Sequence, residues 1–153
     1  MRRLLLIYTG GTIGMITNAQ TGALESFDFA HLYAHIPELK RFELDIQVKS
    51  FAKPLDSSEV SPQHWQQIAS WITQDYDDFD GFVILHGTDT MAYTASALSF
   101  MLENLSKPVV ITGAMLPVRE VRTDARENLI TAIEIAATTE RGRAVVPEVC
   151  VYF

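Results

Sequence analysis

The sequence has 153 residues, a length that fits one domain with a substantial core rather than two full-sized domains. Hydrophobic residues make up 48% and charged residues 20%, an ordinary globular composition, and the net charge of -7 argues against nucleic acid as a partner. The single cysteine, Cys150, excludes an internal disulfide, and no stretch approaches the roughly 20 apolar residues of a membrane-spanning helix. The short apolar start leads into Thr9-Gly10-Gly11 and not into a signal-peptide cleavage site, so we expect a cytoplasmic protein with no membrane partner.

Five segments have the patterns of β-strands. Residues 4–8 are apolar without polar alternation, which predicts a central strand buried on both faces, whereas residues 44–49 alternate and predict one wet face. Residues 82–85 and 109–111 repeat the first pattern, each bounded by Gly or Pro. Residues 149–153 look similar, and Cys150 within them is expected to be a buried strand residue and not a reactive thiol.

Helical patterns lie between these segments. A weak one covers residues 29–35, and a stronger one begins at Ser61, where a cap residue and a proline precede an apolar stripe. Residues 90–103 are apolar nearly all round, which suits a helix packed deep against a sheet, and a capping-box-like start at Asp124 predicts a helix to about residue 137. The alternation of strands and helices predicts an α/β fold, doubly wound, with a mostly parallel sheet and helices on both faces. Ligand sites in such folds lie beyond the carboxyl ends of the strands.

The turn after the first strand combines glycines with hydroxyls. Gly10 and Gly11 let the backbone turn sharply and approach a ligand, and Thr12 follows at once. A dinucleotide fingerprint would need glycines where Thr12 and Met15 stand, and no phosphate-loop lysine is present, so nucleotide binding is disfavoured. A plain turn explains the glycines but not the hydroxyl.

The turn after residues 82–85 has a similar composition. His86 and Gly87 lead into Thr88, Asp89 and Thr90, one of which is expected to cap the next helix. An aspartate at a helix amino terminus is held ionised, so Asp89 is suited to bind an ammonium group or to hold a lysine.

Two further turns belong to the same predicted edge. Asp56, Ser57 and Ser58 follow the second strand and form either a polar helix entry or a set of hydroxyls and N–H groups for a carboxylate. Thr112 follows the strand at 109–111 and either lines the site or belongs to a structural turn.

Other candidate sites are weaker. His31 and His35 are spaced for one helix face but lack an acidic third ligand, so no metal site is expected. His86 is either a general base or a hydrogen-bonded structural residue. The acidic residues between 75 and 80 do not have the spacing of a calcium loop and are read as a solvated loop.

With these motifs in view, the sequence resembles a known family. Residues 9–14 (TGGTIG) and 81–90 (GFVILHGTDT) are similar to the two signatures of the bacterial-type L-asparaginase/glutaminase family. Residues 91–98 and 56–58 look closest to its cytoplasmic type I branch, and the likeness extends over essentially the whole chain. The resemblance identifies residues 1–153 as the N-terminal, nucleophile-bearing domain, without the family's smaller C-terminal α/β domain.

The resemblance implies hydrolysis of L-asparagine to L-aspartate and ammonia through an acyl-enzyme. Thr12 would be the nucleophile, activated by a relay of Thr88, Asp89 and a later lysine. Asp56, Ser57 and Ser58 would hold the α-carboxylate and amine of the substrate, and Asp89 would also meet the ammonium. Backbone N–H groups near Gly11 and Gly87 would stabilise the oxyanion, and no metal or organic cofactor is implied.

The sequence departs from the family pattern in two respects. The relay lysine of the family lies beyond the last strand, and Lys40, Lys49, Lys53 and Lys107 do not match its motif. The loop after Thr12 commonly carries a tyrosine, but residues 16–27 contain none, and Ala23 falls near its expected position.

These departures leave rival functions open. We expect an asparaginase that is a homo-oligomer at full length, with neighbouring subunits completing each site, while the 153-residue chain alone is inactive. The alternatives are a non-catalytic binding or assembly module and an amidotransferase subunit acting on mischarged tRNA, although such subunits usually carry additional sequence before the first motif.

Overall fold

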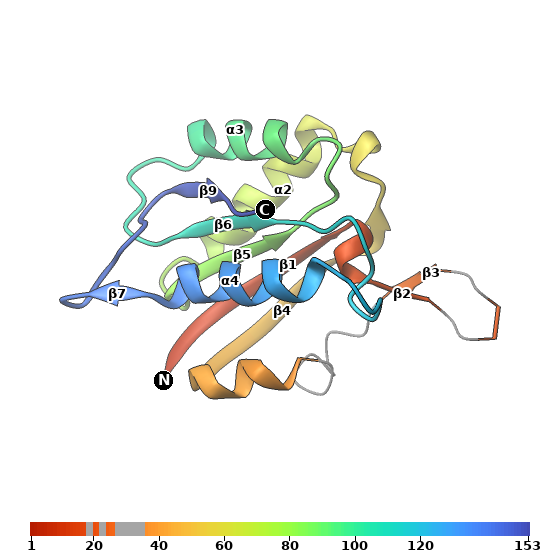
Figure 1. Ribbon diagram of the computed structural model, residues 1–153. Helices are drawn as coiled ribbons and strands as arrows, with labels where there is room; N and C mark the ends of the chain where they lie inside the picture. The colour runs from red at the N-terminus through yellow and green to blue at the C-terminus, as the bar shows by residue number, and fades with distance from the viewer. Residues whose placement is uncertain (18–19, 22–23, 27–35) are drawn as a thin grey trace.

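The computed structural model describes residues 1–17, 20–21, 24–26 and 36–153. Its main element is a five-stranded sheet in the order β4-β1-β5-β6-β9, in which every neighbouring pair is parallel (Figure 1). The strands are β1 (Arg2–Gly10), β4 (Leu44–Leu55), β5 (Gly81–Leu85), β6 (Val109–Thr112) and β9 (Val149–Val151). The parallel α/β fold expected from the sequence is confirmed.

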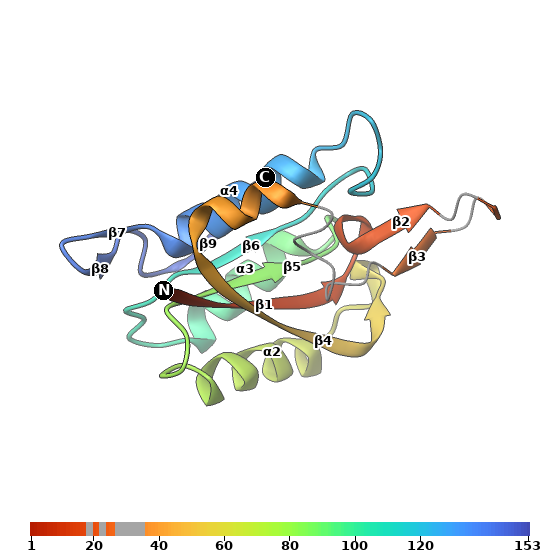
Figure 2. The same cartoon turned by 90° about the horizontal axis from the view of Figure 1, so that it is seen from below.

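Helices cover both faces of the sheet. α2 (Pro62–Gln74) and α3 (Met91–Met101) lie on one face, and α4 (Ala125–Ala137) lies on the other with the 3₁₀ helix η3 (Pro37–Phe42) (Figures 1 and 2). Because successive strand residues point to opposite faces, β1 contributes to two separate cores. Leu4, Leu6 and Tyr8 pack on the α4 side, and Leu5 and Ile7 pack on the α2 and α3 side. The doubly wound arrangement follows from this two-sided burial.

Short elements connect the layers at both ends of the sheet. At the carboxyl end lie η1, β2, β3 and η4, and at the amino end lies the β7–β8 hairpin (Figures 1 and 2). Their bounds are η1 (Thr12–Gly14), β2 (Met15–Thr17), β3 (Leu24–Ser26), η4 (Ser57–Glu59), β7 (Thr139–Glu140) and β8 (Arg143–Ala144). The predicted helix at 29–35, with His31 and His35, lies outside the described residues, as does Ala23.

The expectation of a deeply buried α3 is wrong. Only Met91, Thr94 and Leu98 are buried on it, whereas Tyr93 is 69% exposed and Phe100 is 86% exposed. The helix lies on the outside of the molecule (Figure 1). One stripe of its side chains therefore faces the sheet, and apolar side chains on the opposite stripe face solvent.

The two edge strands also differ from expectation. Val48 of β4 is exposed although its alternating pattern predicts burial, and β9 is only half-buried at Val149 and Cys150. Both strands lie at an edge of the sheet, where fewer neighbours cover the side chains. Partial burial and the nearby Glu148 carboxylate raise the pKa of the Cys150 thiol, which favours the unreactive form.

One helix start is confirmed and another is built differently. At α2, the Ser61 N–H donates to Nδ1 of His64 at 3.0 Å, and Pro62 occupies the first position as predicted. At α4, the Asp124 carboxylate makes no capping bond and instead accepts the N–H groups of Met115 and Leu116 at 2.9 and 3.1 Å. Asp124 therefore fixes the loop before the helix.

Candidate active site at the carboxyl edge of the sheet

Three of the polar turns singled out in the sequence leave adjacent strands at the same edge. β1 lies between β4 and β5, with Tyr8 opposite Leu85 and Gly10 opposite Leu55. The turn at Gly11 and Thr12 therefore follows the strand that lies between the strands leading into residues 86–89 and residues 56–58.

The glycines of these turns allow the backbones to touch. Gly11 has φ 83°, and a Cβ placed on it would lie 2.6 Å from both N and Cα of Gly87. Gly87 is closed in on its other side, since a Cβ there would lie 2.6 Å from Cβ and Oγ of Ser57. Thr12 and Thr88, which follow the two glycines directly, thus extend from backbones in van der Waals contact. Both side chains are partly exposed.

Tyr8 supports the turn that carries Thr12. Its hydroxyl donates to the Gly14 carbonyl at 3.1 Å, and its ring fills the space that a Cβ on Gly14 would occupy. Burial raises the pKa of Tyr8 to about 12, so the phenol stays protonated and remains a donor at neutral pH. The apolar run at residues 4–8 predicts a buried strand position for Tyr8 but not its support of the turn.

The turn at residues 88–90 is tied to the serine turn. The Ser57 hydroxyl donates to Oδ2 of Asp89 at 3.2 Å, and the Thr90 hydroxyl donates to the Ser57 carbonyl at 2.6 Å. Thr90 occupies the N-cap position of α3, but its side chain caps no helical N–H. Ser57 is buried and Asp89 is exposed, so the carboxylate stands at the rim of the site.

Asp56 and Ser58 form a second hydrogen-bonded group. Oδ1 of Asp56 accepts the Ser58 hydroxyl at 2.7 Å and the Ser58 N–H at 2.9 Å. These bonds, the hydroxyl first, lower the pKa of Asp56 below its usual value. The carboxylate is therefore ionised at neutral pH and available for a cationic group.

His86 and Thr112 lie beneath the site and not in it. His86 is fully buried, with Nδ1 2.7 Å from the Gly87 carbonyl and Nε2 2.9 Å from Oγ1 of Thr94. This geometry favours the hypothesis that His86 is a hydrogen-bonded structural residue over the hypothesis that it is a general base. Thr112 is also fully buried, and its Oγ1 has no hydrogen-bond partner among the described residues.

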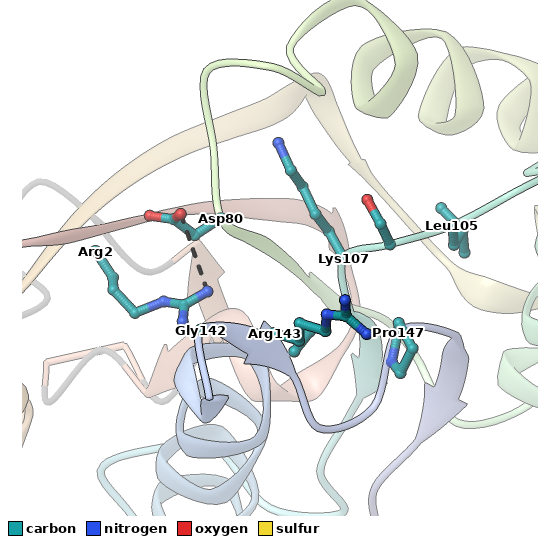
Figure 3. Close-up of a pocket in the computed structure, with 9 residues that line it drawn as sticks. Arg2, Asp80, Leu105, Lys107, Gly142, Arg143 and Pro147 are labelled. Atoms are coloured by element: carbon teal, nitrogen blue, oxygen red, sulfur yellow. Dashed lines mark ion pairs between the residues drawn. The ribbon is translucent and has the colours of Figure 1, made fainter. Parts of the chain in front are cut away.

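A cavity of about 470 Å³ occupies the opposite edge of the sheet (Figure 3). Arg2, Asp80 and Lys107 line it at the amino ends of the strands, together with Arg143 of the β7–β8 hairpin. Nη2 of Arg2 lies 3.9 Å from Oδ1 of Asp80, and the Lys107 ammonium donates to the Tyr76 carbonyl. Because the threonine turns leave the other ends of the strands, this cavity is separate from the candidate active site.

The part of the chain that the structure describes can also be searched for metal-binding clusters and membrane-spanning helices. They contain no group of three or more His, Cys, Asp or Glu side chains placed to hold a metal ion. None of the helices formed by them has the length and apolar content needed to cross a bilayer. His31 and His35 are outside this part of the chain.

The sequence and the fold have counterparts in known proteins. The family profile "Asparaginase, N-terminal" matches residues 3–153. L-asparaginase 1 of Escherichia coli K12 is 50% identical over 137 residues, which cover 89% of this chain and 40% of that protein.

Two solved structures extend the likeness to three dimensions. L-asparaginase I from Vibrio cholerae O1 biovar eltor superposes with a TM-score of 0.84 at 42% identity, covering 99% of this chain and 44% of that one. The probable cytoplasmic L-asparaginase from Campylobacter jejuni gives a TM-score of 0.77 at 31% identity, covering 91% of this chain and 41% of that one. The chain thus spans less than half the length of these relatives. It belongs to the asparaginase family, whose N-terminal domain it matches from Arg3 to its last residue.

Proposed function

We propose that this chain is the nucleophile-bearing domain of an L-asparaginase, which hydrolyses L-asparagine to L-aspartate and ammonia. The observation that carries the proposal is the contact of Gly11 with Gly87, which brings the turns of Thr12 and Thr88 to one point of the sheet edge. The similarity to proteins named L-asparaginase supports the choice of substrate.

In the proposed first step, Oγ of Thr12 attacks the side-chain amide carbon of asparagine. A threonine hydroxyl is a weak nucleophile at neutral pH, so its proton must pass to a base. Thr88 and Asp89 on the neighbouring turn would relay that proton to the later lysine, which would hold it. The C–N bond then breaks, the departing nitrogen takes up a proton and leaves as ammonia, and an ester on Thr12 remains. Water hydrolyses this ester, releasing aspartate and restoring the hydroxyl.

Polar groups around Thr12 suit the two ends of the substrate. The carboxylates of Asp56 and Asp89 match the α-ammonium group, and the hydroxyls of Ser57 and Ser58 match the α-carboxylate. Backbone N–H groups at Gly11 and Gly87 would stabilise the oxyanion of the tetrahedral intermediate. No cofactor enters these steps.

We further propose that the 153 residues need additional parts to turn over substrate. The relatives are more than twice as long as the matched region, and no lysine is hydrogen-bonded to Thr88 or Asp89 in the described part of this chain. The relay lysine and a second domain would come from sequence beyond the match, in a cytoplasmic homo-oligomer whose subunits complete each other's sites.

The assignment of Thr12 can be tested by covalent labelling. We expect a diazo-ketone analogue of asparagine to add its mass to the peptide that contains Thr12 in the full-length protein, as read by mass spectrometry. Thr12→Ala removes the label, whereas Thr139→Ala, on the exposed β7 strand, keeps it. A label on any other residue refutes the assignment.

The need for further parts of the protein can be tested separately. Ammonia release by the 153-residue chain at the rate of the full-length protein refutes it.

A further inference from the structure

A line of hydrogen bonds runs through the interior behind the turn at Gly87 and Thr88. The indole Nε1 of Trp65 on α2 lies 2.9 Å from Oγ1 of Thr94 on α3, and that oxygen lies 2.9 Å from Nε2 of His86. At the far side of the ring, Nδ1 of His86 lies 2.7 Å from the Gly87 carbonyl. His86 and Thr94 are both fully buried.

The chemistry of the groups fixes where each proton lies. An indole N–H can only donate, so Oγ1 of Thr94 accepts from Trp65. The one hydroxyl hydrogen of Thr94 remains available for Nε2 of His86, which accepts it when the ring is neutral and its proton is on Nδ1. A carbonyl can only accept, so the ring proton is on Nδ1 and is donated to Gly87. One tautomer of a neutral imidazole satisfies every group.

The Gly87 carbonyl is the point at which this line reaches the candidate site. Gly87 is in contact with Gly11 on one side and with Ser57 on the other. Its carbonyl carbon is bonded to the nitrogen of Thr88, so fixing the oxygen fixes the plane of the peptide that leads into Thr88.

We propose that Trp65, Thr94 and His86 form a positioning network, in which neutral His86 protonated on Nδ1 holds the Gly87–Thr88 peptide and so aims Thr88 and Asp89 at Thr12. None of the three touches substrate in this scheme, and they act only through the Gly87 carbonyl. The effect on turnover rests on the proposed function, whereas the tautomer of His86 does not.

A packing role for the same residues is the competing explanation, and it predicts different results. Valine has nearly the shape of threonine but no hydroxyl, so Thr94→Val keeps the shape of the side chain, cuts the line at its centre and leaves Nε1 of Trp65 and Nε2 of His86 without this partner. Thr94→Ser keeps the hydroxyl and loses a methyl group. Trp71→Phe is the matched control for Trp65→Phe, because Trp71 also lies on α2 but packs against Phe51.

The first readout is the kinetics of asparagine hydrolysis by the full-length protein. We expect Thr94→Val to lower kcat about tenfold, with KM changed less than about threefold, as for the loss of one neutral hydrogen bond that matters mainly in the transition state. Thr94→Ser should recover most of kcat, Trp65→Phe should lower it, and Trp71→Phe should leave it unchanged. A wild-type kcat in both Thr94→Val and Trp65→Phe overturns the proposal. If Thr94→Val does not fold, the kcat of Trp65→Phe alone decides, and a wild-type value overturns the proposal.

The second readout is the protonation of His86 by ¹⁵N NMR at pH 7 on the full-length protein, with the signals assigned by their loss in His86→Asn. The expected result is a protonated Nδ1 and an unprotonated Nε2 in the wild type, and a changed Nε2 shift in Thr94→Val. A proton on Nε2, or on both nitrogens, overturns the proposal. This measurement needs no turnover, so a protein with the expected tautomer but no asparaginase activity refutes the proposed function and leaves the hydrogen-bond assignment standing.

Discussion

Gly11 is the residue at which the two threonine turns meet, and its contact with Gly87 leaves no room for a side chain. A Cβ would lie 2.6 Å from two atoms of Gly87, and because both are backbone atoms, no side-chain rotation relieves the overlap. We expect Gly11→Ala to lower the free energy of unfolding by roughly 3 kcal/mol or more, from strain at positive φ and steric overlap together. Urea denaturation measures the change.

Gly142 provides the control for this substitution. It has φ 79°, close to the 83° of Gly11, but nothing lies within 4 Å of an added Cβ. Gly142→Ala should therefore cost only the backbone strain, about 1 kcal/mol. Equal losses in the two variants would show that the contact with Gly87 contributes nothing.

At the residue scale, the sequence predicted which turns come together but not what supports them. The glycine–threonine pattern and the parallel strand order together place Thr12 and Thr88 at one edge. Trp65 and Thr94 gave no such signal, because each also fits the pattern of a helix that packs on a sheet. Their bond joins residues 29 positions apart, which only the packing of α2 on α3 brings together.

Among the helices, α3 shows how far an apolar pattern can mislead. Leu98 and Phe100 are both large and apolar, yet Leu98 is fully buried and Phe100 is 86% exposed. We expect Leu98→Ala to cost about 2–5 kcal/mol of folding free energy and Phe100→Ser to change it by less than about 0.5 kcal/mol, both from urea denaturation. A large loss in Phe100→Ser would place its ring in a packed environment.

The same limit applies to the strands. A continuous apolar run correctly predicted β1, β5 and β6, which have a strand on each side. It did not reveal that β9 lies at an edge, because strand order depends on pairing between distant segments. Hydrophobic pattern therefore predicts which elements form, and position in the sheet decides how deeply each is buried.

For the whole molecule, two cores meet at the sheet, and the candidate site lies where the strands of both cores end. Alternate residues of β1 belong to different cores, so displacement of this strand disturbs both. His86 at the end of β5 is buried at the same place, and its environment links the stability of the fold to pH.

Burial lowers the pKa of His86 from its ordinary 6.5, outweighing the opposing bond to the Gly87 carbonyl, and its ring contacts Thr94 and Gly87, neither of them charged. The unfolded chain therefore takes up a proton on this residue at a higher pH than the folded one. Above about pH 7.5 both states are neutral at His86 and the residue adds no pH dependence. As pH falls below 6.5, the unfolded state binds the extra proton and stability declines, by up to about 1.4 kcal/mol per pH unit until the folded pKa is reached.

The measurement is the free energy of unfolding in urea between pH 5 and 8 for wild type and His86→Asn. The other three histidines of the chain are common to both proteins, so their contributions cancel in the difference. The wild type should lose more stability than the variant as pH falls, and parallel curves would mean that His86 accepts a proton in the folded protein as readily as in the unfolded one.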